Sequence, residues 1–233
     1  MDVSQKNTET FNEIITFRKG LLEKVKNAYA NDEVKAKKIS INQAEFNANK
    51  KEWLDKIIKL NFDHSVYIIC LSESDGRDKD EISNLFTAKK EQEREINPKF
   101  ALPSLNKVTN FPTNKCLYVG STTSNALGKR LLEHLGYVCS MTSKPLKDGL
   151  TKKLREIGST TTAVKIDLWL PRWALNIYYY TFSLDDTVDT FALSSVKESE
   201  REKGFRECTR YFEDCIADQL QPLLGKRGSS PRG

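Results

Sequence analysis

Five side chains of this sequence have the types needed for chemistry on a phosphate ester: Tyr67, Tyr118, Arg130, His134 and Glu213. A carboxylate can hold a hard divalent cation through oxygen, with waters completing its shell. An arginine fork can bind a phosphate and the extra negative charge of its transition state. A tyrosine beside such cations loses its proton more readily and can then accept one from an attacking water. Together these groups suit metal-assisted hydrolysis of a phosphodiester.

Arg130 and His134 lie one turn apart on a helix predicted over about 125–137. At about 100° per residue, the four leucines of this helix share one side, and the Arg and His fall at its border. These leucines are Leu127, Leu131, Leu132 and Leu135. At a border, packing can hold a polar side chain rigidly while it still reaches a cleft. A snorkelling arginine and a partly buried histidine with an ordinary hydrogen bond are the structural alternatives.

Both tyrosines lie in predicted strands. Tyr67 is in the middle of the β-branched, aromatic run 64–71, and Tyr118 is in the similar run 115–120. The charged and proline-containing residues between them predict an insertion over about 72–114, with a short helix at most. The two strand tyrosines, the Arg–His helix and a carboxylate on a later helix form a set that could share one chemical role.

The remaining elements of this region complete a predicted α+β domain. Two further strands are expected over 163–170 and 176–184. A long helix is expected over about 195–221, with Glu213 at the edge of its apolar stripe. This order of elements predicts a small mixed or antiparallel sheet flanked by helices.

The first 60 residues read as an N-terminal helical extension, with amphipathic helices over 9–30 and 32–60. Such an extension could be a dimerisation arm, a clamp or a cover for the sheet. The main domain is expected over 61–228, and residues 229–233 are expected to form a flexible tail.

The charge of the chain is mildly positive, with a formal net of +5. Residues 126–158 hold seven basic and three acidic side chains, which give a local net of +4. A local basic zone is the expected footprint of a polyanion, although a solvated surface would look similar. The candidate contacts to a polyanion are Lys115, Lys129, Lys144, Lys147, Lys152, Lys153 and Arg155.

Composition argues against several other classes of protein. Five cysteines without a Cys-x-x-Cys pair do not make a disulfide framework, and no spacing supports a zinc site. The polar start of the chain is unlike a signal peptide, and no apolar run reaches the roughly 20 residues of a membrane span. We therefore expect a cytoplasmic protein that does not enter membranes.

Taken together, these motifs resemble the GIY-YIG endonuclease superfamily over about 64–228. The family has two short strand motifs, then a helix with an Arg and often a His or Tyr one turn later, then a helix with a Glu followed by a Pro. The matches here are SVY at 65–67, YVG at 118–120, Arg130 with His134, and Glu213 with Pro222. The combination is fairly specific, whereas any one piece is weak.

The resemblance implies hydrolysis of DNA with a single metal ion, Mg²⁺ or Mn²⁺. It implies Tyr67 or Tyr118 as the general base, Arg130 on the phosphate and Glu213 on the metal, with His134 in the same catalytic set. The candidate polyanion contacts then become candidate contacts to double-stranded DNA.

Three features depart from the family pattern. Ser65 and Val66 replace the Gly-Ile of the first motif. The two motif tyrosines lie 51 residues apart, which is unusually far, so the insertion would have to loop out of a hairpin. Gly225 stands near the place where many members carry an Asn after the Pro.

The leading prediction is a sequence-specific DNA endonuclease, of type II restriction or another role in bacterial or phage defence. A homodimer is expected, because one site cuts one strand and a palindrome matches a two-fold pair. The restriction role is an analogy from the family. A catalytically inactive nucleic-acid-binding module on the same scaffold is the alternative. A helical interaction protein that works through its first 60 residues is a third.

Overall fold

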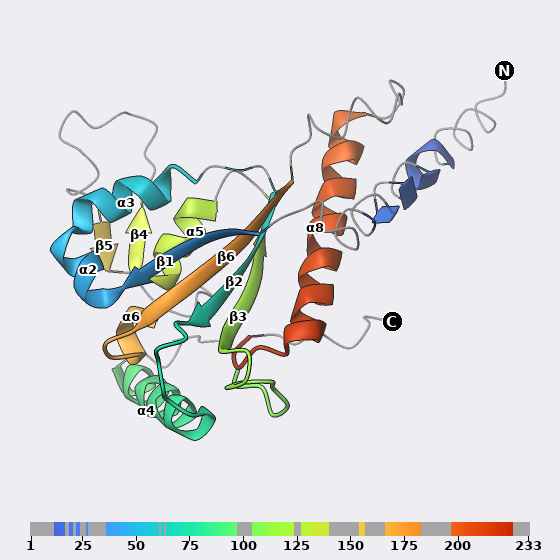
Figure 1. Cartoon of the computed structure of the whole chain (residues 1–233). Helices are drawn as coiled ribbons and strands as arrows, with labels where there is room; N and C mark the ends of the chain where they lie inside the picture. The colour runs from blue at the N-terminus through green and yellow to red at the C-terminus, as the bar shows by residue number, and fades with distance from the viewer. Residues whose placement is uncertain are drawn as a thin grey trace, which may run out of the picture.

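The computed structural model of the chain describes residues 12–16, 19–20, 22–23, 27, 36–60, 62, 64–96, 104–123, 127–139, 154–156, 166–182 and 197–225. Four strands form the main sheet: β1 (Lys37–Asn42), β2 (His64–Leu71), β3 (Cys116–Thr122) and β6 (Ala174–Phe182). They lie in the order β1-β6-β2-β3, and every neighbouring pair is antiparallel. Helices flank this sheet (Figure 1), and the predicted α+β class is confirmed.

Strand β2 lies inside the sheet, between β6 and β3, and all eight of its residues are buried. Its side chains alternate between two apolar clusters, as the two-residue period of a strand requires. Val66 and Ile68 belong to the cluster under the long C-terminal helix α8 (Glu198–Leu220). Tyr67 and Ile69 belong to the larger cluster on the opposite face. Burial on both faces explains why this segment reads as a continuous apolar run.

Helix α8 covers one face of the sheet (Figure 1). Its buried side chains recur every three or four residues and include Phe205, Cys208, Phe212 and Ile216. The helix ends at Leu220, and the N–H of the capping residue Gln221 bonds to the Ala217 carbonyl at 2.7 Å. The left-handed backbone of Gln221 (φ 47°) then turns the chain out of the helix. The predicted helix over 195–221 is confirmed.

Three helices lie on the other face: α2 (Gln43–Ala48), α3 (Lys50–Ile58) and α5 (Leu127–His134). The start of α5 touches the end of α3, because the Gly128 N–H bonds to the Leu60 carbonyl at 2.8 Å. A Cβ on Gly128 would lie 2.1 Å from the Ile57 carbonyl oxygen. Glycine is therefore needed here for α5 to approach α3 closely. A two-stranded ribbon, β4 (Tyr137–Cys139) and β5 (Leu154–Glu156), follows α5.

The predicted insertion does loop out of a hairpin, because β2 and β3 pair directly with Tyr67 opposite Gly120. The insertion contains α4 (Lys79–Ile96), which at 18 residues is longer than the short helix predicted. The ring of Phe86 on α4 meets the ring of Trp169 edge-on, with centroids 5.1 Å apart.

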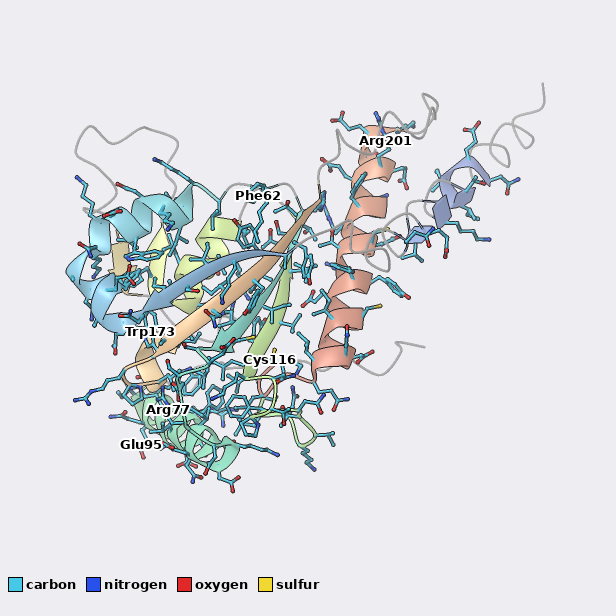
Figure 2. The ribbon with its side chains drawn as sticks, in the orientation of Figure 1. Phe62, Arg77, Glu95, Cys116, Trp173 and Arg201 are labelled. Carbon is cyan, nitrogen blue, oxygen red and sulfur yellow. The ribbon has the colours of Figure 1, made fainter. Side chains whose placement is uncertain are left out.

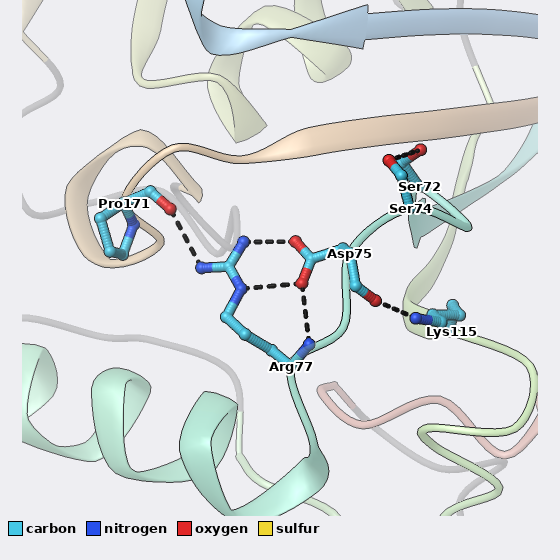
Figure 3. Close-up of polar contacts among 6 residues, drawn as sticks. All are labelled: Ser72, Ser74, Asp75, Arg77, Lys115 and Pro171. Carbon is cyan, nitrogen blue, oxygen red and sulfur yellow. Dashed lines mark hydrogen bonds and ion pairs between the residues drawn. The ribbon is translucent and has the colours of Figure 1, made fainter.

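A polar cluster ties the base of the insertion together (Figure 3). The carboxylate of Asp75 accepts hydrogen bonds from the backbone N–H and the guanidinium of Arg77. Arg77 also donates to the Pro171 carbonyl at 3.0 Å, and Lys115 donates to the Asp75 carbonyl. These contacts connect the end of β2, the start of β3 and the turn before β6. Arg77 is labelled beside α4 in Figure 2.

The segment after α8 runs along the outer edge of β3. The N–H groups of Leu223 and Leu224 bond to the carbonyls of Cys116 and Leu117 at 3.0 and 2.8 Å. On its other side, the Leu223 carbonyl accepts the Asn106 N–H at 2.9 Å, and the Gly225 N–H bonds to the Ser104 carbonyl at 3.0 Å. Residues 221–225, called the C-terminal strip below, therefore cover the edge strand.

Two sequence predictions about local structure are wrong. The helix predicted over 32–60 is interrupted by strand β1, in which Ile39 and Ile41 are buried and their neighbours are exposed. That alternation has the period of a strand, and β1 extends the sheet next to β6. The strand predicted over 163–170 contains a short helix, α6 (Ile166–Trp169), whose end residues are both buried at helical spacing.

The N-terminal part of the chain is described only in places. Residues 12–16, 19–20, 22–23 and 27 are helical, and the rest of the predicted helix over 9–30 lies outside the described residues. The predicted tail over 229–233 also lies outside them. Within the part of the chain that the structure describes, no helix is both long and apolar enough to cross a membrane.

Candidate active site

The hydroxyl of Tyr67 is the centre of the candidate site. Tyr67 is fully buried in β2, and its hydroxyl lies 2.9 Å from Nε2 of His134 on α5. The same hydroxyl accepts a hydrogen bond of 3.3 Å from Nε of Arg130, one turn earlier on that helix. The Arg–His pair predicted on the border of the leucine face therefore meets a strand tyrosine.

The two helical partners of Tyr67 differ in burial. His134 is only 1 % exposed, so it lies inside the core rather than at its border as predicted. The rings of Tyr67 and Tyr118 cover it, with centroids 5.4 and 5.0 Å from the imidazole. Arg130 is partly exposed, as the border prediction requires, and its guanidinium also donates to Glu133 at 2.7 Å.

Gly120, the glycine of the YVG motif, makes room for both motif tyrosines. A Cβ at this position would lie 2.6 Å from the Tyr67 hydroxyl oxygen and 2.7 Å from a ring carbon of Tyr118. Real Cβ atoms do not approach other atoms so closely, so only glycine fits without movement. The Tyr67 and Tyr118 rings lie 6.2 Å apart in this space.

Glu213 reaches the site from α8, on the other face of the sheet. Its carboxylate accepts a hydrogen bond from the hydroxyl of Ser121, the residue after the YVG motif. The negative charge of Glu213 contributes to raising the pKa of both Tyr67 and Tyr118. The positive charge of Arg130 in turn lowers the pKa of Glu213. The structure therefore brings Tyr67, Tyr118, Arg130 and His134 together from β2, β3 and α5, while Glu213 approaches them from α8 through its contact with Ser121.

Burial governs the protonation of these groups. It raises the pKa of Tyr67 well above its ordinary value; Tyr118 raises it further, and Arg130 acts against the rise. Burial likewise raises the pKa of Tyr118. Burial and then the charge of Arg130 lower the pKa of His134 well below its ordinary value. At neutral pH the two phenols are therefore protonated, and the imidazole is uncharged.

The carboxyl of Glu213 is also displaced from its ordinary pKa. Burial raises this pKa, the Ser121 hydrogen bond lowers it, and the negative charge of Asp214 raises it. Ser121 thus acts in favour of the ionised carboxylate, the form that binds cations.

Two site residues escaped the sequence predictions. Ser121 follows the YVG motif directly, so the alternation of β3 could have placed it on the face opposite Tyr118. Gly225 was noted only as a replacement for the family Asn. Its φ is +102°, and a Cβ there would lie 2.9 Å from the ring of Tyr118, so glycine lets the C-terminal strip pack on that ring.

The predicted DNA contacts are only partly described. Lys129 is exposed on α5, and Lys115 donates to the Asp75 carbonyl inside the fold. Arg155 lies in β5, but its side chain is outside the described part of the structure. The other four predicted contacts, Lys144, Lys147, Lys152 and Lys153, lie outside the described residues.

Among the described residues, no three His, Cys, Asp or Glu side chains gather closely enough to hold a metal ion between them. A cation at this site would therefore depend on Glu213, with waters as its other ligands. The donor set fits such a cation electrostatically, because the negative charge of Glu213 contributes to raising the pKa of both Tyr67 and Tyr118. A nearby dication would relieve that repulsion.

The chain was also compared with known proteins. Searches against protein-family models, curated proteins and solved structures found no match for it. The indication of function therefore comes from the geometry and chemistry of the site residues.

Proposed function

We propose that this chain is a divalent-metal-dependent endonuclease of the GIY-YIG type, which hydrolyses phosphodiester bonds of double-stranded DNA. One observation carries the proposal: the Tyr67 hydroxyl meets both Arg130 and His134, and the charge of Glu213, from the other face of the sheet, still acts on it. Convergence of residues so distant in sequence supports a shared chemical role.

Arg130 is the group proposed to bind the phosphate. Its guanidinium is held by the Tyr67 hydroxyl on one side and by the Glu133 carboxylate on the other. This fixes its orientation before any substrate arrives. A preorganised positive charge stabilises the negative charge that develops on a phosphate in the transition state.

Tyr67 is favoured over Tyr118 as the proton acceptor, because its hydroxyl lies 2.9 Å from Nε2 of His134. Burial and Arg130 keep that imidazole neutral, and in the tautomer with its proton on Nδ1 the Nε2 atom accepts from the Tyr67 hydroxyl. When an attacking water gives a proton to the Tyr67 oxygen, Tyr67 can release its own proton to His134. The pair then returns to its starting state by losing one proton to solvent.

Glu213 is proposed to hold Mg²⁺ or Mn²⁺, with Ser121 keeping the carboxylate ionised and oriented. When bound, the ion would supply positive charge beside the reacting phosphate. We further propose a sequence-specific restriction or defence role and a homodimer, since each chain carries one such set of residues and a duplex has two strands.

A catalytically inactive nucleic-acid-binding module is the second candidate. Gly225 favours it, because glycine stands near the family Asn and offers no side chain to the reaction. The two candidates differ in metal dependence. An inactive module would bind DNA equally well with and without Mg²⁺ and would leave a supercoiled plasmid intact.

The deciding experiment is incubation of the purified chain with plasmid and phage DNA, with Mg²⁺ or with a chelator, followed by sequencing of any new ends. We expect cleavage that requires the metal and is abolished by Glu213→Ala. Glu202→Ala is the matched control, because Glu202 is an exposed carboxylate on the same helix. A Glu213→Ala protein that still cut DNA with Mg²⁺ would refute the proposal.

A further inference from the structure

A cavity of about 260 Å³ lies between α4 and the returning part of the insertion. It is called the α4 cavity here, and its lining includes Phe86, Thr87, Lys90, Glu91, Arg94 and Ser104. None of these residues belongs to the candidate active site or to the predicted DNA contacts. Apolar and hydroxyl side chains therefore line the same space as two cations.

The two cations of the α4 cavity are one helical turn apart and repel each other. Burial lowers the pKa of Lys90, and the charge of Arg94 lowers it further. Neither Lys90 nor Arg94 forms an ion pair with a residue that the structure describes. The adjacent Lys89, by contrast, pairs with Glu93 at 2.9 Å. With Glu91 included, the charged side chains of the lining sum to +1. Arg94 is exposed and Lys90 is half-buried, with Glu91 as the acidic side chain of the same lining, so an anion bound from solvent between the two cations would reduce their repulsion.

The α4 cavity is connected to the candidate active site through one hydrogen bond and one packing contact. The carbonyl of Ser104 accepts the Gly225 N–H at 3.0 Å. Gly225 in turn lies against the ring of Tyr118, where a Cβ would come within 2.9 Å of it. Ser104 in the wall of the cavity is thus connected to Tyr118 of the candidate site through Gly225.

We infer that the α4 cavity binds a backbone phosphate of the DNA, on the same duplex as the phosphate proposed to meet Arg130; this inference rests on the proposed function. The planar fork of Arg94 suits two phosphate oxygens, and the ammonium of Lys90 supplies a point charge. The hydroxyls of Thr87 and Ser104 can donate to the same group, and Phe86 offers an apolar surface to the sugar. Such a contact fixes the register of the duplex and carries no sequence information.

The test uses the full chain carrying Glu213→Gln, so that DNA is bound without being cut. Lys90→Gln and Arg94→Gln are each added to this parent, and Lys89→Gln is the matched control. The dissociation constant for a short duplex of mixed sequence is measured over a range of salt concentrations. Each neutralised phosphate contact steepens the salt dependence, so its loss should reduce the slope of log K against log salt by about 1.

We expect Lys90→Gln and Arg94→Gln to weaken binding and reduce the slope, while Lys89→Gln leaves both unchanged. Neither cavity variant should lower the thermal stability, because each removes a repulsion; a purely structural role would lower it. Unchanged binding by both cavity variants, or an equal loss with Lys89→Gln, overturns the inference and leaves the proposed function standing. A parent that does not bind DNA at all overturns both.

Discussion

Ser121 of β3 donates a hydrogen bond to the carboxylate of Glu213 on α8. This contact joins the edge strand of the hairpin to the helix that covers the opposite face of the sheet. Its position matters because the site combines side chains from both faces. Tyr67 lies in the cluster on one face and meets His134 of α5 there, whereas Glu213 comes from the helix on the other face.

Loss of this hydrogen bond should shift the pH dependence of cleavage. Burial raises the pKa of Glu213, and Ser121 opposes the rise, so Ser121→Ala should raise that pKa further. Activity that needs the ionised carboxylate is lost as pH falls through its pKa, so the acidic limb should move to higher pH. Ser121→Thr, which keeps the hydroxyl, should restore the limb. Rates of plasmid nicking across pH test this, and an unmoved limb in Ser121→Ala would contradict it.

Glu213 should cost the fold some stability at neutral pH. Because its pKa is raised in the folded state, the unfolded chain ionises it more readily, and stability rises as pH falls through the folded pKa. Glu213→Gln should therefore raise the free energy of unfolding, and with it the Tm, at neutral pH. The gain should shrink at about pH 4, where the native carboxyl is protonated. Thermal melts at the two pH values measure it, and a lower neutral-pH Tm for the variant would argue against buried, ionised Glu213.

Arg130 should be needed for the chemical step more than for DNA affinity. Arg130→Ala should reduce the cleavage rate by about 10²–10³-fold, the usual effect of removing one transition-state donor. Arg130→Lys should also cut poorly, because an ammonium cannot reproduce the planar contacts to Tyr67 and Glu133. Single-turnover rates and binding constants separate the two effects. Lys51→Ala, at an exposed position of α3 outside the predicted DNA contacts, is the control and should keep the wild-type single-turnover rate.

Gly120 should tolerate no side chain. In Gly120→Ala the new methyl group would lie 2.6 Å from the Tyr67 hydroxyl, so the tyrosines must move. We expect a loss of about 1–3 kcal/mol in stability, as for other overpacked sites, together with loss of cleavage. Gly76→Ala is the matched control, because nothing lies within 4 Å of a Cβ there. Denaturant unfolding of both variants tests this, and equal stability would mean that the rings adjust freely.

The sequence predicted the strands and helices whose own residues determine their type, without help from distant contacts. Strand β2 matches its predicted bounds because both of its faces are buried, and α8 follows from the spacing of its apolar residues. Strand β1 was missed because a single short alternation, KKISIN, lies inside a long polar segment rich in lysine. Whether it becomes helix or strand is decided by its pairing with β6, which is far away in the sequence.

The sequence analysis named the residues of the candidate site, but it predicted their arrangement only in part. A helical wheel places Arg130 and His134 together at a border, but it cannot show that Tyr67 and Tyr118 cover the imidazole. The Ser121–Glu213 bond and the contact of Gly225 with Tyr118 were missed for a related reason. Both depend on where α8 and the C-terminal strip lie against β3, and no local pattern encodes that docking.

The C-terminal strip lies between β3 and the second half of the insertion. This position limits how far the β2–β3 hairpin can be shortened. Replacing residues 72–114 with a tight turn would take away the hydrogen-bond partners of the strip at Ser104 and Asn106. The strip would keep its bonds to Ala217, Cys116 and Leu117, but the Gly225 N–H would lose the Ser104 carbonyl that holds it beside Tyr118. A shortened version of this protein must therefore retain the second half of the insertion or supply other hydrogen-bond partners for the C-terminal strip.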